Sequence, residues 1–180
     1  MKYILDTNVF WDVLRKWNNS KDAEIPTKLK NDGIISFALS EISAMEIYSV
    51  LGNCFRQKPQ RQRCDRKVEN EQGLVECPHV WRRVSIQKRM NNEELKELRR
   101  LIDDILKKRN KNFNMTIIPL NDEIMRRSII LLKNHSLEHD LHSLDAIIGA
   151  TSVKSGCTLV TFDKTLIKVL KKEGVSVESP

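Results

Sequence analysis

The sequence predicts an α/β fold in which helices cover both faces of a mostly parallel sheet. Short apolar runs typical of buried strands alternate along the chain with stretches whose apolar residues recur at helical spacing. Strands connected through helices run parallel, by right-handed crossovers. Two of the apolar runs end in a carboxylate, Asp6 and Asp163, at the edge where such sheets bind ligands. With 180 residues, 40% apolar and 31% charged, the chain suits one domain.

The first fifty residues are predicted to form two strands, each followed by a helix. Residues 1–5 make the first strand, and the apolar spacing from Phe10 to Trp17 favours a helix that starts after Asp6. The second strand, at 34–37, follows a short helix at 24–30 and the turn residues 31–33. Ser40 is a good N-cap for a helix that extends to about residue 51.

Residues 92–180 continue the alternation of strands and helices. Asn92 suits the cap of a long helix whose apolar stripe runs from Leu95 to Leu106, opposite a charged face. Further strands are expected at 115–118, 158–161 and 175–177, and further helices after Asn121, after Ser143 and at 164–172.

The stretch at about 53–91 breaks this pattern. It is polar and without clear periodicity, so we expect a partly helical or flexible insertion in a single domain spanning 1–180. Residues 53–90 hold ten Lys and Arg against four acids, an excess of 10 − 4 = +6 out of the whole chain's +7. A basic surface attracts polyanions. This basic segment could bind RNA phosphate, bind an acidic protein partner, or simply be a solvated surface. Its candidate phosphate-binding residues are Arg82, Arg83, Lys88 and Arg89.

No apolar run in the sequence approaches the roughly 18 residues of a membrane span. Asp6 also interrupts the apolar run at the N-terminus, which argues against a secretory segment. We therefore expect a cytoplasmic protein that does not contact a membrane.

Four carboxylates occupy apolar surroundings. Asp6 and Asp163 follow strands, whereas Glu46 and Asp145 lie on otherwise apolar helical stretches. Such a carboxylate costs several kcal/mol unless a cation or hydrogen-bond donors compensate it. Hard oxygen ligands are typical of Mg²⁺ and Mn²⁺ sites, so the pattern indicates metal-assisted phosphoester chemistry. Alternatively, the two aspartates are only N-caps, each stabilising its helix by about 1 kcal/mol.

These pieces of sequence resemble the PIN-domain family, a group of metal-dependent nucleases that includes the VapC-type toxins of toxin–antitoxin pairs. The matching pieces are ILDTNV at 4–9, Ser40 followed by Glu46, DAIIGAT at 145–151 and LVTFD at 159–163. The resemblance covers 1–52 and about 92–180. It implies an α/β/α sandwich with a five-stranded parallel sheet.

The resemblance implies one acidic pocket, which is catalytic and binds one or two Mg²⁺ or Mn²⁺ ions, made by Asp6, Glu46, Asp145 and Asp163. Four residues would support that pocket: Thr7 and Asn8 in its first turn, Thr161 inside it and Ser40 at the start of the Glu46 helix. RNA as the substrate rests on the resemblance alone. An acidic antitoxin and a homodimer are the protein partners that the family suggests.

Two other functions compete with a ribonuclease. A catalytically silent RNA- or partner-binding module on the same fold would have no physical reason to keep four carboxylates together. A phosphatase of the haloacid-dehalogenase type would need an aspartate where Asn8 stands.

Histidines and tryptophans leave smaller questions open. His135, His139 and His142 are expected in a polar loop, as solvated side chains or as contacts to metal or phosphate. Trp11 and Trp17 suit helix packing, with stacking on a nucleobase as the alternative.

Overall fold

The structure, a computed structural model, describes the backbone of 2–19, 24–55, 60–63, 67–70, 73–76, 81–84 and 91–180, and the side chains of 2–19, 24–52 and 91–180. The chain divides into two compact units, one made of Met1–Ser49 with Arg100–Pro180 and the other of Val50–Arg99. The first unit carries the sheet, and the second carries the basic segment. Among the described residues, no helix is long and apolar enough to cross a membrane.

The first unit alternates strands and helices in the order that the sequence predicts. Its strands are β1 (Tyr3–Leu5), β2 (Lys30–Asn31), β3 (Ile34–Ser40), β8 (Phe113–Ile118), β9 (Thr158–Val160) and β10 (Val177–Glu178). Its helices are α1 (Thr7–Asn18), the 3₁₀ turn η2 (Thr27–Leu29), α4 (Asp122–His135), α5 (Ser143–Ser155) and α6 (Lys164–Lys172). Two helices cross the boundary between the units, α2 (Glu41–Phe55) and α3 (Asn92–Leu106).

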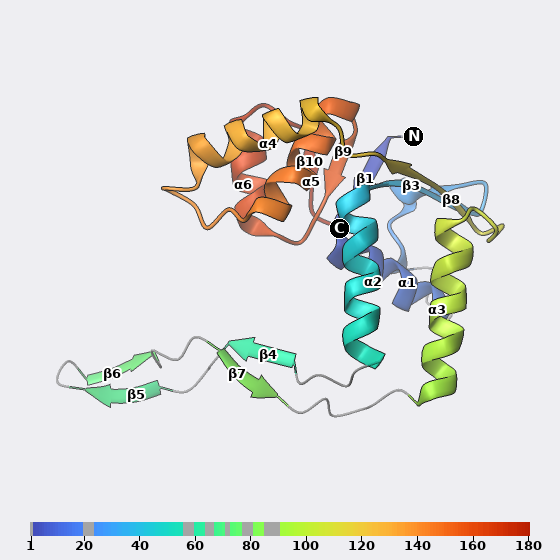
Figure 1. Cartoon of the computed structure of the whole chain (residues 1–180), viewed down its shortest axis with the longest axis horizontal. Helices are drawn as coiled ribbons and strands as arrows, with labels where there is room; N and C mark the ends of the chain where they lie inside the picture. Colours follow the sequence, from blue (N-terminus) through green and yellow to red (C-terminus); the bar gives the residue numbers. More distant parts are fainter. Residues whose placement is uncertain are drawn as a thin grey trace. The chain divides into compact units, whose positions relative to one another are not determined.

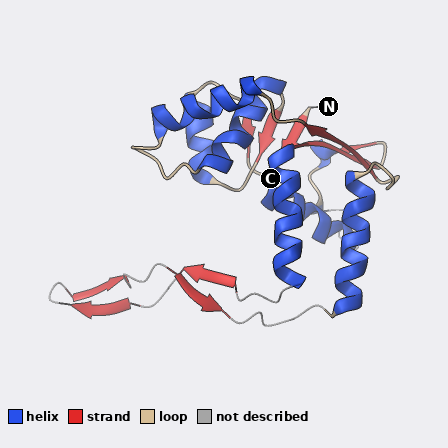
Figure 2. Ribbon diagram, in the orientation of Figure 1, coloured by secondary structure: helices blue, strands red, loops and turns tan. Residues whose placement is uncertain are grey.

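Five strands of the six-stranded sheet run parallel, in the order β10-β9-β1-β3-β8, labelled in Figure 1 and drawn as red arrows in Figure 2. The remaining strand, β2, pairs antiparallel with the first residues of β3. The predicted α/β/α fold with a mostly parallel five-stranded sheet is thus confirmed, with β2 as an addition. Chain order reverses around β1, the strand that Asp6 follows, and open α/β sheets bind ligands at such a switch point.

One face of the sheet packs against α4, α5 and α6, which Figure 1 shows together beside β9 and β10. The register pairs Ile4 with Ala38 on one side and with Leu159 on the other, so these side chains share a face. All three belong to one buried cluster with Ile148 of α5 and Val169 of α6. Burial of this apolar surface holds the three helices on the sheet.

The other face carries aromatic packing against α1. Phe37 of β3 lies in edge-to-face contact with Phe10 of α1, at 6.1 Å between ring centroids, and with Phe113 of β8, at 6.2 Å. Trp17 contacts Phe113 at 5.2 Å, and Trp11 contacts Phe10 at 5.9 Å. These edge-to-face pairs fix α1 on the sheet and confirm the packing role expected for Trp17.

Two predicted helix caps are displaced by one residue. The side chain of Asn91, not Asn92, accepts hydrogen bonds from the N–H groups of residues 93 and 94 at the start of α3. The residue before α5 is His142, whose side chain makes no capping bond, and the predicted cap Ser143 is the first helical residue. Asn121 does cap α4, by accepting from the N–H of Ile124 at 2.9 Å. Neighbouring polar residues compete for a cap, so the position shifts easily.

The basic segment contains two antiparallel strand pairs among its described residues. β4 (Gln60–Arg63) pairs with β7 (Trp81–Val84), and β5 (Lys67–Asn70) pairs with β6 (Gly73–Glu76). The sequence predicted a partly helical or flexible insertion here, and beyond Phe55, where α2 ends, the described part of this segment contains strands. Arg82 and Arg83 lie in β7, whereas Lys88 and Arg89 lie outside the described residues.

Candidate functional site

Two of the four predicted carboxylates follow adjacent strands of the sheet. Asp6 comes after β1 and Asp163 comes shortly after β9, its parallel neighbour. The N–H of Asp6 donates to the carbonyl of Val160 at 3.0 Å, which extends the pairing of the two strands to the site. Glu46 lies on α2, which follows β3, and Asp145 lies in the first turn of α5.

Asp6 is the most buried of these acids, with 6% of its surface exposed. Its Oδ1 accepts from the N–H of Thr7 at 2.6 Å, and its Oδ2 accepts from the hydroxyl of Thr161 at 2.7 Å. The Thr161 oxygen also accepts from the N–H of Asp163 at 3.0 Å. Thr161 thus joins the two aspartates, and its donated bond offsets part of the cost of burying the Asp6 carboxylate. The resemblance implied a hydrogen-bonding role in the pocket for Thr161, and these two bonds are compatible with that prediction.

Thr7 links Glu46 to Asp6 through hydrogen bonds. The hydroxyl of Thr7 donates to Oε2 of Glu46 at 2.6 Å, so Thr7 contacts two acids, one through its N–H and one through its hydroxyl. At the start of α2, the Ser40 hydroxyl oxygen accepts from the N–H of Ser43 at 2.9 Å, and both serines are buried. Ser40 therefore caps the helix that carries Glu46, as predicted.

Asp145 is half-buried, and its Oδ2 lies 3.9 Å from Nδ1 of His142. The same His142 nitrogen lies 3.7 Å from Asp140, whose side chain is 91% exposed. His142 therefore lies beside one of the candidate carboxylates, Asp145. The sequence alone did not distinguish His142 from the other two loop histidines. Asp140 lies at the surface, as its polar surroundings in the sequence suggested.

Burial and neighbouring negative charges raise the pKa values of two of the candidate carboxylates. Burial raises the pKa of Asp6, and the negative charge of Asp163 adds to the rise. Burial also raises the pKa of Asp145, and the charges of Asp163, Asp6 and Glu46 raise it further. Asp145 is therefore close enough to the other three carboxylates to be affected by their charges.

These raised pKa values predict how stability depends on pH. A carboxyl whose pKa is higher in the fold than in the unfolded chain stabilises the fold only while protonated, and this contribution is lost as pH rises through the folded-state pKa. In EDTA, Asp6 and Asp145 should therefore lower the melting temperature as pH increases from about 4, near the pKa of an unfolded Asp, toward neutrality. Thermal melts at a series of pH values measure this.

The control for this pH dependence is the double variant Asp6→Asn with Asp145→Asn, which keeps the shape of both side chains. In this variant, the part of the fall in melting temperature with rising pH that Asp6 and Asp145 cause should disappear. A variant profile parallel to that of the wild type would show that neither carboxyl titrates above its unfolded range.

The chemistry of the donor set suits a hard divalent cation, because all four candidate ligands are carboxylates. Among the described residues, no three Asp, Glu, His or Cys side chains converge tightly enough to enclose an ion by themselves. Mg²⁺ keeps several waters and binds proteins through one or two carboxylates together with substrate phosphates. An open site of this kind fits that mode and does not fit a closed cage such as structural zinc.

Both aspartates at the strand ends are also helix caps, so the two interpretations of the sequence are compatible. Asp6 is the N-cap of α1, and Asp163 is the N-cap of α6, where its Oδ1 accepts from the N–H of Leu166 at 2.9 Å. A cap uses some of the acceptor capacity of the carboxylate and fixes its direction.

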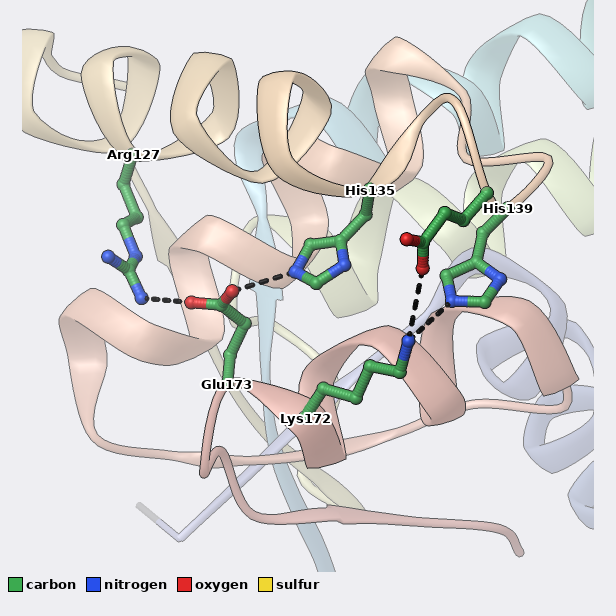
Figure 3. A network of polar contacts seen from close by, with 6 residues as sticks. Arg127, His135, His139, Lys172 and Glu173 are labelled. Atoms are coloured by element: carbon green, nitrogen blue, oxygen red, sulfur yellow. Dashed lines mark hydrogen bonds and ion pairs between the residues drawn. The ribbon is translucent and has the colours of Figure 1, made fainter.

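His135 and His139 belong to a different polar network (Figure 3). His135 is the last residue of α4 rather than a loop residue, and it is buried. Its Nε2 lies 2.7 Å from the carboxylate of Glu173, to which Arg127 also donates at 2.8 Å. Lys172 contacts His139 at 3.2 Å. These contacts tie α4 and the residues after it to the end of α6, which is a structural role.

Comparisons with known proteins agree with this fold. The PIN domain family matches residues 3–172. VapBC2 from Rickettsia felis, solved with a promoter DNA fragment, is 17% identical, with 100% of this chain and 99% of that chain covered and a TM-score of 0.56. FitAcB from Neisseria gonorrhoeae is 14% identical, with 97% and 95% covered and a TM-score of 0.54. VapBC-1 from nontypeable Haemophilus influenzae is also 14% identical, with 99% and 98% covered and a TM-score of 0.51. At these identities the likeness establishes the fold. No curated protein sequence matches significantly.

Proposed function

The chain belongs to the PIN-domain family, whose members are generally nucleases, and we propose that it is a divalent-metal-dependent ribonuclease that hydrolyses RNA phosphodiester bonds. We further propose that it acts in the cytoplasm as the toxin of a toxin–antitoxin pair. The observation that supports the proposal is the raised pKa of Asp6 and Asp145, caused first by burial and then by the charge of Asp163 on both and of Asp6 and Glu46 on Asp145. Such an arrangement costs stability and is hard to explain without a cation.

In this proposal Asp6 and Asp163 hold one or two Mg²⁺ or Mn²⁺ ions directly, and Glu46 and Asp145 do so directly or through water. A divalent ion there would polarise a phosphoryl oxygen and lower the pKa of a bound water. Thr161 and Thr7 keep the Asp6 carboxylate in place through the bonds to its two oxygens. A carboxylate that contacts the ion only through water can orient the attacking water and accept its proton. Hydrolysis would leave a 5′-phosphate and a 3′-hydroxyl, as expected for this family.

A purified-protein assay tests the proposal. The protein is incubated with a mixed RNA pool and with matched single-stranded DNA, in Mg²⁺, in Mn²⁺ and in EDTA, beside Asp6→Asn. Metal-dependent RNA products that are lost in the variant support the proposal. Metal-dependent thermal stabilisation without cleavage would indicate an intact metal site with another substrate. If neither effect appears, the catalytically silent binding module on the same fold becomes the better explanation.

The basic segment is proposed to bind RNA phosphate, in addition to or in competition with an acidic antitoxin. Neutralising Arg82, Arg83, Lys88 and Arg89 together should weaken RNA binding at low salt. Each lost phosphate contact on a single strand reduces the slope of log K against log salt by about 0.7, so the slope should fall by up to about 3. Titrations at several salt concentrations measure it. An unchanged slope would assign this segment to another role, such as the antitoxin interface.

The family's tendency to dimerise leads us to propose a homodimer as well.

A further inference from the structure

A pocket of about 460 Å³ lies beside the acidic residues and is not used by the proposed chemistry. It is lined by Asn8, Trp11, Asp12, Arg15 and Phe162. Chain continuity places it next to the site, since Phe162 stands between Thr161 and Asp163, and Asn8 follows Thr7 directly. A ligand in this pocket therefore lies close to anything bound at the carboxylates.

Two aromatic side chains give the pocket its apolar surface. Phe162 is 47% exposed and stands between two residues of the candidate site, Thr161 and Asp163. Trp11 packs edge-to-face on Phe10, which is only 1% exposed, so the indole is anchored to the core. The Nε1 of Trp11 is covered yet has no hydrogen-bond partner among the described residues, and such an unpaired donor needs an explanation.

The polar side of the pocket is lined by one acid and one base, Asp12 and Arg15, and Lys16 outside the lining pairs with the same carboxylate. Asp12 is paired with Arg15 at 2.7 Å and with Lys16 at 2.8 Å, so one carboxylate faces two cations. The Arg15 side chain is 71% exposed and is free to reach a second anion from its place on α1. Asn8 is also exposed and offers both a donor and an acceptor.

We propose that this pocket binds a nucleobase of single-stranded RNA, next to the phosphate that is cleaved. The base stacks on Trp11 and Phe162, Asn8 bonds to its edge, and Arg15 contacts a neighbouring phosphate. Because the indole N–H lies in the ring plane, its acceptor would have to lie at the edge of the indole and not on the stacked base. Stacking on aromatic side chains and an adjacent cation are the usual means of holding single strands. The proposal rests on the proposed nuclease function, because it places the base of a substrate whose phosphate lies at Asp6 and Asp163.

Binding measured without cleavage tests this proposal separately from catalysis. In EDTA, the affinity of the full chain is measured for a fluorescein-labelled single-stranded RNA and for an abasic oligomer with the same number of phosphates. Aromatic stacking predicts that the RNA binds roughly 5- to 150-fold more tightly per stacked base. Trp11→Ala and Phe162→Ala should each reduce this ratio, whereas Trp11→Phe should keep most of it because the stacking surface remains.

Tyr48→Ala is the matched control, because Tyr48 is an aromatic residue of similar exposure (40%) on α2, outside the pocket. Its ratio should equal that of the wild type. Phe162→Ala should fold, since its ring is half exposed, and thermal melts check every variant. Equal binding of RNA and abasic oligomer by the wild type, or an unchanged ratio in Phe162→Ala, would overturn the proposal and leave the pocket to a protein partner.

The two proposals fail in different ways. Metal-dependent cleavage, together with equal binding of RNA and abasic oligomer, would contradict only the proposal of a base pocket. A base preference that depends on Phe162, without cleavage under any metal condition, would support the base pocket and contradict the nuclease function.

Discussion

Asp6→Asn is expected to reduce RNA cleavage by more than about a hundredfold while leaving the protein in EDTA at least as stable as the wild type. Loss of residues that only orient metal ligands costs about 10- to 100-fold, and loss of a proposed ligand should cost more. Stability should not fall, because burial and the charge of Asp163 oppose ionisation of Asp6, and Asn carries no charge. The Asn oxygen still accepts from Thr7, and its NH₂ can donate to Thr161.

Cleavage rates in Mn²⁺ and thermal melts in EDTA measure the two parts of this prediction. A stabilisation of about 1 kcal/mol corresponds to roughly 2–4 °C in a chain of this size. Glu41→Gln is a suitable control, because Glu41 is an exposed acid at the start of the same helix as Glu46 and bonds the N–H of Leu120. It should cleave at the wild-type rate. Cleavage by Asp6→Asn at that rate would exclude the assigned pocket.

At Asp163, two substitutions separate the cap from the metal ligand. Asp163→Asn should keep the cap of α6, since Asn caps as well as Asp, and Asp163→Ala should lose it at a cost of about 1 kcal/mol. Both should lose cleavage by more than about a hundredfold, because neither retains the carboxylate. If the aspartate were only a cap, Asp163→Asn would cleave normally and Asp163→Ala would lose activity only as far as it loses stability.

Activity and thermal stability must therefore be measured on both variants. The comparison is with Asn121→Ala, which removes the cap of α4. It should lower stability by a similar amount and leave the cleavage rate unchanged. A loss of cleavage in Asn121→Ala equal to that in Asp163→Ala would show that helix stability, and not the carboxylate, controls the rate.

Several features could be predicted because they depend on neighbouring residues alone. The apolar runs before Asp6 and Asp163 mark strands, and the polar residues Ser40 and Asn121 mark helix starts. The strands of the basic segment could not be found in this way. β4, for example, has the sequence Gln-Arg-Gln-Arg, which carries no apolar alternation. Its pairing with β7 is long-range, and no local preference encodes it.

The sequence by itself determined which carboxylates stand at strand ends and on apolar helices, because hydrophobic spacing and capping act over a few residues. Only the tertiary structure decided how they meet. The bond from Thr161 to Asp6 joins residues 155 positions apart, and it exists because β1 and β9 pair in one register. The meeting of Trp11 with Phe162 in one pocket depends on that same pairing. A strand register is fixed by the packing of the whole sheet, which no short stretch of sequence contains.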